Sequence, residues 1–440
     1  MEKTPTLVKE QILESYIQGK ERLQKRNDAG IEKYRKGDFT LRFKDASKKK
    51  ITVKQVKHKF LFGTTAFMLK SFEKPEKEEI YKEKFVQLFN QAVVPFYWAG
   101  LEPTEGKPRF DKDSENVYRR PAPDLVLDFC KEYDIEPKGH CLLWDLALPE
   151  WLADYNEEDK KRIIERRFKE IAERYADKIP SFDIVNEAAS NYNHGKKVLF
   201  EGYDEYGLQL GGKYFPNNRK ILNETNGAIW LDFLKGKYMA FSTMLRDFLK
   251  KGLPFDEIGL QYHIFVKAEE LMGWPEYMCF IDINNHLEML DFYDQYNIPM
   301  HLSEITIPSY WGGNETNEEV QAVLVENLYK TWFATKNMKS IVWWNMVDGY
   351  AGGGKLGSGD GENYYGGGLL RFDMSEKPAY KVLDRLINHE WKTSFEKVVD
   401  GESVDFRGFY GDYEITVEDN TGKRTITASF YEDGDSVTIQ

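Results

Sequence analysis

Cysteine is scarce in this sequence of 440 residues, which contains only Cys130, Cys141 and Cys279. The number is odd and the spacings are wide, so the pattern fits neither a disulfide framework nor the paired spacing of a zinc site. A reduced compartment agrees with this composition, and so does a secreted protein without disulfides.

The sequence also lacks long apolar runs and an excess of basic residues. No stretch approaches 18 apolar residues, so we predict no membrane-spanning helix. There are 61 basic and 73 acidic side chains, a formal net charge of −12, which argues against nucleic acid or an anionic membrane as a partner. The first residues, Met1–Leu7, are polar and contain no apolar signal core. We therefore expect a chain that is either cytoplasmic or secreted after loss of a leader.

Aromatic residues, in contrast, are abundant. They make up 15% of the chain, with 10 Trp, 26 Tyr and 28 Phe, and hydrophobic residues make up 41%. This content overrules the disorder that 30% charged residues would suggest. Two interpretations of the aromatic residues stay open at this point, namely stacking surfaces for sugars and a large packed core.

Eight short runs of apolar residues recur along the chain. Apolar runs of this length, bounded by polar segments, are typical of buried parallel strands. They are Phe60–Ala66, Ala92–Tyr97, Lys138–Leu143, Ser181–Asn186, Arg219–Asn223, Ile258–His263, Met300–Ile305 and Ile341–Met346.

Amphipathic helical segments lie between these runs. The predicted helices are Glu158–Ala176, Trp230–Leu249, Pro275–Tyr296, Glu318–Lys336 and Ala379–Trp391, and Pro75, Pro123, Pro275 and Pro378 stand near expected helix starts. Alternating strands and helices in eight units predict an α/β protein with a closed (β/α)8 TIM barrel. A doubly wound open sheet is the alternative, but it would usually have a glycine-rich turn after its first strand, and Phe62–Thr65 has a single glycine.

The two ends of the chain differ from the barrel pattern. Phe39–Lys59 and Val404–Gln440 alternate like strands, with turn signals at Asp419–Gly422 and Glu432–Asp435. Neither piece makes a stable sheet alone, so we expect both to pair in one small accessory β module, preceded by a helix over Ile12–Arg35. The predicted units are residues 1–58 and 393–440, which form this module, and residues 59–392, which form the barrel.

Functional groups of a TIM barrel lie at the carboxyl ends of its strands. The predicted strand ends carry His140, Asp145, Asn186, Glu187, Asn223, Glu224, Gln261, His263, Glu304, Trp343, Trp344 and Asp348. Glu187 on the fourth strand and Glu304 on the seventh can meet across the barrel mouth. Two such carboxylates can cleave a glycosidic bond, at about 5–5.5 Å apart with retention and about 6.5–9.5 Å apart with inversion. A cap or an ion pair is the alternative role for either glutamate.

Several motifs, in this order, resemble glycoside hydrolase family 10, whose typical members are endo-β-1,4-xylanases. They are Gly139–Trp144 with Leu148–Leu152, Phe182–Glu187, Leu260–His263, Leu302–Ile305, Trp344–Asp348, Leu369–Asp373 and Lys377–Tyr380. The resemblance covers about Lys59–His389. It implies a retaining hydrolase of β-1,4-linked xylan or xylo-oligosaccharides, and we expect a monomer.

The resemblance also assigns roles to residues. It implies Glu187 as acid/base and Glu304 as nucleophile, and it assigns Asn223–Glu224, the second Asn-Glu pair, to the fifth strand. Asn186 is expected to bind the sugar 2-hydroxyl, and His263 to orient Glu304. The remaining expected substrate-binding residues are His140, Trp144, Asp145, Trp98, Gln261 and Trp344.

Three positions depart from the family pattern. The second strand runs Val93–Trp98 and lacks the Glu, Asn and Lys that grip the next sugar in typical xylanases. Phe96, Tyr97 and Trp98 are expected to supply an aromatic platform there. Asp145 replaces a histidine, and Thr306 replaces the aspartate that usually partners the His263 position. Lost hydrogen-bond partners change discrimination strongly, so another plant β-glycan, a decorated oligosaccharide or a catalytically weak sugar-binding barrel are alternative readings.

The glycine-rich segment Gly349–Gly368 follows the last predicted strand. It fits neither a phosphate-binding loop nor a calcium loop, so we expect a mobile loop over the cleft, and no cofactor and no metal. A phosphate-dependent aldolase is a further rival, but no lysine ends the sixth strand.

Overall fold

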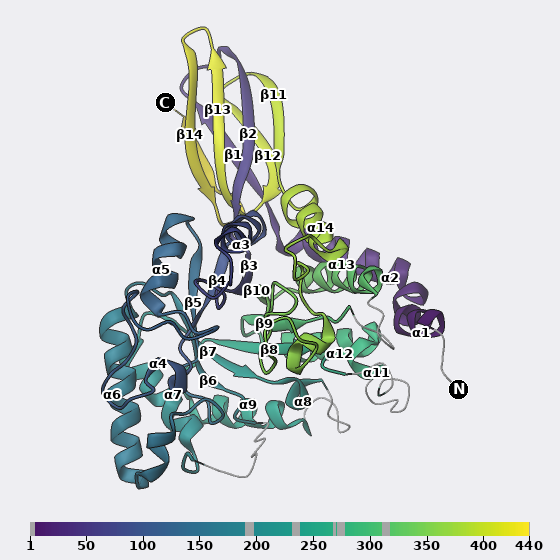
Figure 1. The fold of residues 1–440 in the computed structure, drawn as a ribbon. Coiled ribbons are helices and arrows are strands. Elements are labelled where there is room, and N and C mark those ends of the chain that lie inside the picture. Colours follow the sequence, from purple (N-terminus) through teal and green to yellow (C-terminus); the bar gives the residue numbers. More distant parts are fainter. Residues whose placement is uncertain are drawn as a thin grey trace.

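The computed structural model describes residues 5–189, 198–230, 238–266, 270, 278–309 and 317–439. Its centre is a closed barrel with strand order β10-β3-β4-β5-β6-β7-β8-β9 (Figure 1), and neighbouring strands are parallel. The strands are β3 (Leu61–Thr65), β4 (Gln91–Pro95), β5 (Glu136–His140), β6 (Ser181–Asn186), β7 (Arg219–Glu224), β8 (Glu257–His263), β9 (Met300–Thr306) and β10 (Met338–Trp343). All eight predicted strands are present, and the TIM-barrel prediction is confirmed.

The barrel strands are hidden on both faces. Every residue of β6, β8 and β9 is buried, because one side packs inside the barrel and the other against the surrounding helices. This double burial explains why the strands are continuous apolar runs interrupted by a few polar residues. Those polar residues gather at the carboxyl ends, where the site lies.

Helices surround the barrel, as Figure 1 shows. They are α3 (Pro75–Leu88), α4 (Trp98–Leu101), α5 (Pro123–Glu132), α6 (Glu157–Tyr175), α7 (Tyr203–Tyr214), α8 (Asn226–Ile229), α9 (Ala240–Lys251), α11 (Met278–Ile281), α12 (Ile283–Asp294), α13 (Glu318–Ala334) and α14 (Pro378–Asp384). Pro75, Pro123 and Pro378 occupy the first turn of their helices, where a missing amide hydrogen is harmless.

Several helix predictions need correction. Of the helix expected over Trp230–Leu249, the described part is α9, which begins at Ala240 and extends to Lys251, while residues 231–237 lie outside the described residues. Ala379–Trp391 continues from α14 into a π-helical turn over Arg385–Glu390. The expected helix start at Pro275 lies outside the described residues.

Strands from both ends of the chain form two accessory sheets. One has the order β12-β1-β15 and the other β11-β2-β13-β14, and Figure 1 shows them standing together beyond one end of the barrel. Their bounds are β1 (Lys36–Phe43), β2 (Lys48–His58), β11 (Ser394–Asp400), β12 (Ser403–Phe409), β13 (Gly411–Asp419), β14 (Gly422–Phe430) and β15 (Ser436–Ile439). The alternating apolar residues of these strands share one core, which includes Phe39, Ile51 and Tyr413.

The helix expected over Ile12–Arg35 is broken at Gly19 into α1 (Pro5–Gln18) and α2 (Lys20–Tyr34). The α2 helix lies against α13, where a Cβ on Gly30 would clash with the carbonyl of Ala334. Within the described ranges, no helix combines the length and the apolar character that crossing a bilayer requires.

Candidate active site

Glu187 and Glu304 meet at the carboxyl-terminal mouth of the barrel through one shared donor. The side-chain Nε2 of Gln261 lies 2.8 Å from Glu187 Oε1 and 3.0 Å from Glu304 Oε1. These two carboxylate oxygens are therefore no farther apart than the sum of the two distances. Three strand ends, those of β6, β8 and β9, thus place two acids and an amide in one cluster.

Glu187 is the residue directly after β6, and its backbone is unusual. Its φ of +57° lies in the left-handed region, which is uncommon for a residue with a side chain and is frequent at functional sites. The amide N–H of Glu187 donates to Asn223 O at 2.9 Å, and the indole N–H of Trp144 donates to Glu187 Oε2 at 3.1 Å. The turn and these two bonds aim the carboxylate at the barrel axis.

Glu304 lies within β9 and is 4% exposed. Its Oε1 accepts hydrogen bonds from Asn223 Nδ2 at 2.9 Å and from Gln261. His263 Nε2 lies 3.2 Å from Glu304 Oε2. Both oxygens of this buried carboxylate therefore face hydrogen-bonding groups.

His140 is the last residue of β5, and its ring contacts a buried ion pair. Asp183 Oδ2 lies 2.7 Å from His140 Nδ1 and 2.8 Å from Lys138 Nζ. The other ring nitrogen, Nε2, lies 3.1 Å from the Tyr97 hydroxyl and 3.7 Å from Glu304 Oε1. Asp183 thus fixes the orientation of the imidazole, and Nε2 is directed toward the nucleophile candidate.

His263 has Thr306 as its second partner. Its Nδ1 lies 2.9 Å from Thr306 Oγ1, and its ring stacks on Phe265 with centroids 4.7 Å apart. Burial lowers the pKa of His263 to about 4, because a buried imidazolium loses its hydration. The side chain is therefore neutral at neutral pH.

Both glutamates have raised pKa values. Burial raises the pKa of Glu187 to about 7, and the charge of Glu304 adds to that increase. Burial also raises the pKa of Glu304 to about 7, against the lowering effect of His140. Two like charges in one water-poor site cannot both form easily, so the pair favours holding a single proton near neutral pH.

Aromatic rings line the space around the pair. Trp344 is 6% exposed, and its ring meets the edges of His140 and His263 at centroid distances of 5.3 and 5.8 Å. Trp144 meets the ring of Tyr97 at 5.6 Å. Asn186 ends β6 beside them, and its Oδ1 accepts from Asn223 Nδ2 at 2.7 Å. The two acids are therefore surrounded by indole rings and amide groups, which are side-chain types that contact sugars.

The glycosyl hydrolase family 10 model matches residues 52–384, which include every one of these side chains. The chain belongs to glycosyl hydrolase family 10. Endo-1,4-beta-xylanase B of Neocallimastix patriciarum is 22% identical over 285 residues, which cover 62% of this chain and 29% of that protein. The anti-sigma-I factor RsgI6 of Acetivibrio thermocellus is 24% identical over 402 residues, or 88% of this chain and 45% of that protein. The chain therefore spans less than half the length of these two relatives.

A solved structure confirms the fold of this family 10 barrel. Xylanase 10B from Thermotoga petrophila, in complex with xylobiose, superposes with a TM-score of 0.58 at 19% identity. The match covers 76% of this chain and 95% of that chain. The two chains therefore share the fold of the barrel.

One predicted substrate-binding residue, Trp98, packs away from the carboxylate pair of this family 10 site, and Asp145 contacts a neighbouring loop. Trp98 is 2% exposed; its indole N–H donates to Glu102 at 2.8 Å, and the guanidinium of Arg167 covers its ring at 4.8 Å. Asp145 Oδ1 accepts from the backbone N–H of Leu199. Trp98 therefore packs among the loops and helices, and Asp145 holds a neighbouring loop.

The expected aromatic platform of the second strand is only partly formed. Phe96 points away from the site, with its ring against Tyr175 and Phe182 at 5.3 and 5.8 Å. Tyr97 alone reaches the site, through its hydroxyl. Its neighbours Phe96 and Trp98 face the helices, where Phe96 contacts Tyr175 and Trp98 lies under the guanidinium of Arg167.

Asn223 and Asp183 belong to the site but were not among its predicted members. Asn223 donates to both Asn186 and Glu304, and its place at a strand end was the available signal. Asp183 is an isolated acid inside an apolar run, a pattern that could have been recognised as a barrel-interior partner. Glu224, the second Asn-Glu glutamate, accepts from the backbone N–H groups of Ala189 and Thr225 at 2.7 and 2.9 Å, so it acts as a structural acceptor.

The glycine-rich loop borders the cleft. Glu362 accepts from Asn345 Nδ2 at 2.7 Å, and Tyr365 contacts Phe265 at a centroid distance of 5.1 Å. A Cβ on Gly367 would lie 2.5 Å from the methyl group of Thr306. The loop is therefore packed directly behind the residue that partners His263.

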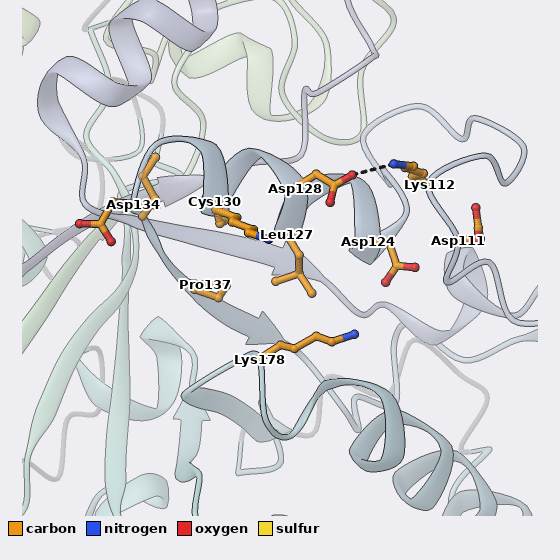
Figure 2. Close-up of a pocket in the computed structure, with 11 residues that line it drawn as sticks. Asp111, Lys112, Asp124, Leu127, Asp128, Cys130, Asp134, Pro137 and Lys178 are labelled. Atoms are coloured by element: carbon orange, nitrogen blue, oxygen red, sulfur yellow. Dashed lines mark hydrogen bonds and ion pairs between the residues drawn. The ribbon is translucent and has the colours of Figure 1, made fainter.

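A separate cavity of about 670 Å³ lies beside α5, and Figure 2 shows its charged lining. Asp128 pairs with Lys112 at its edge, and Pro137 and Lys178 lie on its other side. Pro137 is near the start of β5, so the cavity is on the amino-terminal side of the barrel, where residues mainly serve stability. Among the described residues, no group of three or more His, Cys, Asp or Glu side chains is arranged to hold a metal ion.

Proposed function

We propose that this protein is a retaining glycoside hydrolase that cleaves β-1,4-linked xylan or xylo-oligosaccharides. The observation that carries the proposal is the contact of one amide nitrogen, Gln261 Nε2, with both Glu187 and Glu304. The nearest oxygens of the Glu187 and Glu304 carboxylates are closer together than the roughly 6.5–9.5 Å that separates the two carboxyl groups of inverting enzymes. That larger separation leaves room for a water molecule. The family membership and the xylanase relatives support the choice of substrate.

In the proposed mechanism, Glu187 donates its proton to the glycosidic oxygen while Glu304 attacks the anomeric carbon. The leaving sugar departs with that proton, and a covalent glycosyl-enzyme forms on Glu304. Glu187, now ionised, takes a proton from water as the water attacks the same carbon and releases Glu304. Two inversions give net retention of configuration.

The hydrogen bonds favour this division of roles between the two acids. Glu304 receives donors from Asn223 and Gln261 and faces His263, and donors stabilise an anion. Glu187 accepts one hydrogen bond each from Gln261 and Trp144, and the charge of Glu304 raises the pKa of Glu187 further. The shared proton therefore resides on Glu187, as the first step requires.

Thr306 sets the tautomer of His263. A threonine hydroxyl can donate to Nδ1, which leaves the proton on Nε2 to donate to Glu304. An aspartate could only accept, so it would place the proton on Nδ1. Thr306 thus lets a neutral imidazole support the ionised nucleophile.

Asn186 is the proposed contact to the sugar 2-hydroxyl. Asn223 occupies its carbonyl oxygen, which directs the amide NH₂ group toward a different partner. Trp344 is the proposed stacking surface for the same sugar, and His140 is the proposed neighbour on its other side. Hydrogen bonds to the 2-hydroxyl strengthen in the transition state of this reaction and thereby accelerate it.

The test is hydrolysis of xylans, glucans and aryl β-glycosides by the wild type, Glu187→Ala and Glu304→Ala. We expect activity on a β-1,4-xylan and losses of about 10²–10⁴-fold or more for each variant. Glu173→Gln, whose side chain is 64% exposed on α6, serves as the control. Absence of hydrolysis on every β-glycan would refute the proposal, and binding without turnover would favour a sugar-binding barrel.

A further inference from the structure

A cationic side chain stands beside the catalytic pair, on the side of the second strand. Arg120, in the segment between α4 and α5, places its guanidinium carbon 4.0 Å from the ring centroid of Tyr97 and 5.4 Å from that of Phe67. The Tyr97 hydroxyl contacts His140, which lies 3.7 Å from Glu304. One aromatic ring and one imidazole therefore connect this guanidinium to the proposed nucleophile.

Arg120 has no carboxylate within ion-pair distance among the residues that the structure describes. The hydrogen bond from its side chain runs from Nη1 to the backbone carbonyl of Arg119 at 2.8 Å. A guanidinium has five N–H donors, so most of them remain for a ligand. The adjacent Arg119 differs, because it is buried and donates to Asn345 and to the carbonyl of Tyr350.

The surroundings leave the charge of Arg120 uncompensated. Burial and the neighbouring charge of Arg119 lower the pKa of Arg120, against the effect of Tyr97. The charge of Glu362 raises the pKa of Arg120, but Glu362 lies beyond ion-pair distance. Its Oε2 already accepts a hydrogen bond from Asn345. A partly desolvated cation without a counter-ion favours binding of an anion.

We infer that Arg120 is a carboxylate-binding residue and that the substrate of the proposed hydrolase carries a hexuronic acid unit near the cleaved bond. This inference rests on the proposed function and narrows its substrate class. The polar Glu, Asn and Lys of typical xylanases are absent from Val93–Trp98, and Arg120 on Tyr97 lies at that place. Guanidinium and carboxylate match as a two-point pair, and stacking on Tyr97 preorganises the guanidinium.

The net charge of the protein strengthens this argument. A chain of formal charge −12 repels an acidic glycan over its general surface. An acidic substrate therefore needs a local cation at the cleft, and Arg120 supplies one.

Binding tests the inference independently of turnover. Glu187→Gln is titrated calorimetrically with a xylo-oligosaccharide that carries one glucuronic acid and with the neutral oligosaccharide of the same length. We expect the acidic ligand to bind about tenfold to a hundredfold more tightly at low salt, as charged hydrogen bonds imply. Adding Arg120→Met, which keeps the length and apolar contact of the side chain, should remove this preference.

The control is Arg162→Ala in the same background, since this α6 side chain is 72% exposed and pairs with Asp159. It should preserve the preference. Equal affinities of the two ligands before Arg120 is changed would overturn the inference. A preference that survives Arg120→Met in a variant with unchanged Tm would overturn it too.

Kinetics separates failure of the inference from failure of the proposed function. The ratio of kcat/KM on the acidic and neutral oligosaccharides should fall with Arg120→Met. If the wild type hydrolyses both equally well, the function stands and the inference fails. If it hydrolyses neither but still binds the acidic ligand through Arg120, the inference stands and the proposed hydrolysis fails.

Discussion

The chemistry of this site depends on a few residues whose neighbours differ from the usual family pattern. His263 is the clearest case, because Thr306 occupies the place of an acidic partner. A hydroxyl can reverse its role as donor or acceptor, whereas a carboxylate cannot. The neutral state of His263 follows from that difference together with burial.

Replacing Thr306 by Asp tests this account of His263. The introduced carboxylate would stabilise the imidazolium, so the pKa of His263 should rise from about 4 toward neutral pH. The new positive charge would in turn lower the pKa of Glu304 and move the acidic limb of the kcat/KM profile to lower pH. NMR titration of the ring gives the first value, and the pH–rate profile gives the second. The Thr306→Ser variant keeps the hydroxyl and should leave both values close to those of the wild type; an unchanged His263 in Thr306→Asp would contradict the account.

At the scale of elements, the barrel strands position the site, and the loops around them determine its particular properties. The glycine-rich loop illustrates this, because Gly367 lies against Thr306 and Tyr365 against Phe265. Thr306 and Phe265 are both direct neighbours of the His263 ring. The loop therefore supports the residue that orients the proposed nucleophile.

Gly367→Ala should disturb this support. Its Cβ would lie 2.5 Å from the Thr306 methyl group, so Thr306 or the loop must move, and overpacking of this kind typically costs about 1–3 kcal/mol. We expect a lower Tm and a lower kcat. Gly359→Ala in the same loop is the matched control, since no atom lies within 4 Å of the added Cβ. Equal effects of the two substitutions would show that packing against Thr306 is not the cause.

The elements that periodicity determines are predictable from the sequence, and those that tertiary contacts determine are not. The eight strands were predictable because burial on both faces leaves continuous apolar runs. The strand β11 was not predicted, since only one of its seven residues is buried and no alternation marks it. The break at Gly19 and the end of α8 at Ile229 also lack strong local signals.

The residues of the site likewise divide into those that the sequence predicts and those that only tertiary contacts reveal. Glu187 and Glu304 were predictable from strand ends and motif order, although their catalytic roles remain proposals. Asn223 is not predictable as a member of the site, because its place at a strand end does not reveal which side chains it contacts. Trp98 was expected in the cleft, but its burial against Arg167 depends on α6, which is distant in the sequence. The unit boundaries at 58 and 392 likewise stay a prediction.

At the scale of the whole molecule, the site is a source of instability that depends on pH. The folded protein retains one proton on the Glu187–Glu304 pair up to about pH 7, whereas an ordinary glutamate loses its proton near pH 4.5. As the pH rises between these values, the unfolded chain releases the proton more easily, so folding becomes less favourable. Below about pH 4.5 both states hold the proton and the difference disappears.

Glu304→Gln should therefore stabilise the protein at high pH. We expect its free energy of unfolding to exceed that of the wild type by on the order of 3 kcal/mol at pH 8 and to match it near pH 4. Denaturant unfolding at the two pH values measures this difference. A Glu304→Gln variant that is less stable than the wild type at pH 8 would contradict the raised pKa of Glu304.

The central claim is that Glu304 is the nucleophile of a retaining hydrolase with Glu187 as acid/base. The most direct measurement is mass spectrometry of the protein after reaction with a 2-deoxy-2-fluoro xylobioside, which slows release of a covalent intermediate. The account predicts one glycosyl group on the peptide that contains Glu304, and none in Glu304→Ala. A label on another residue, or inverted configuration in the product of the normal reaction, would contradict it.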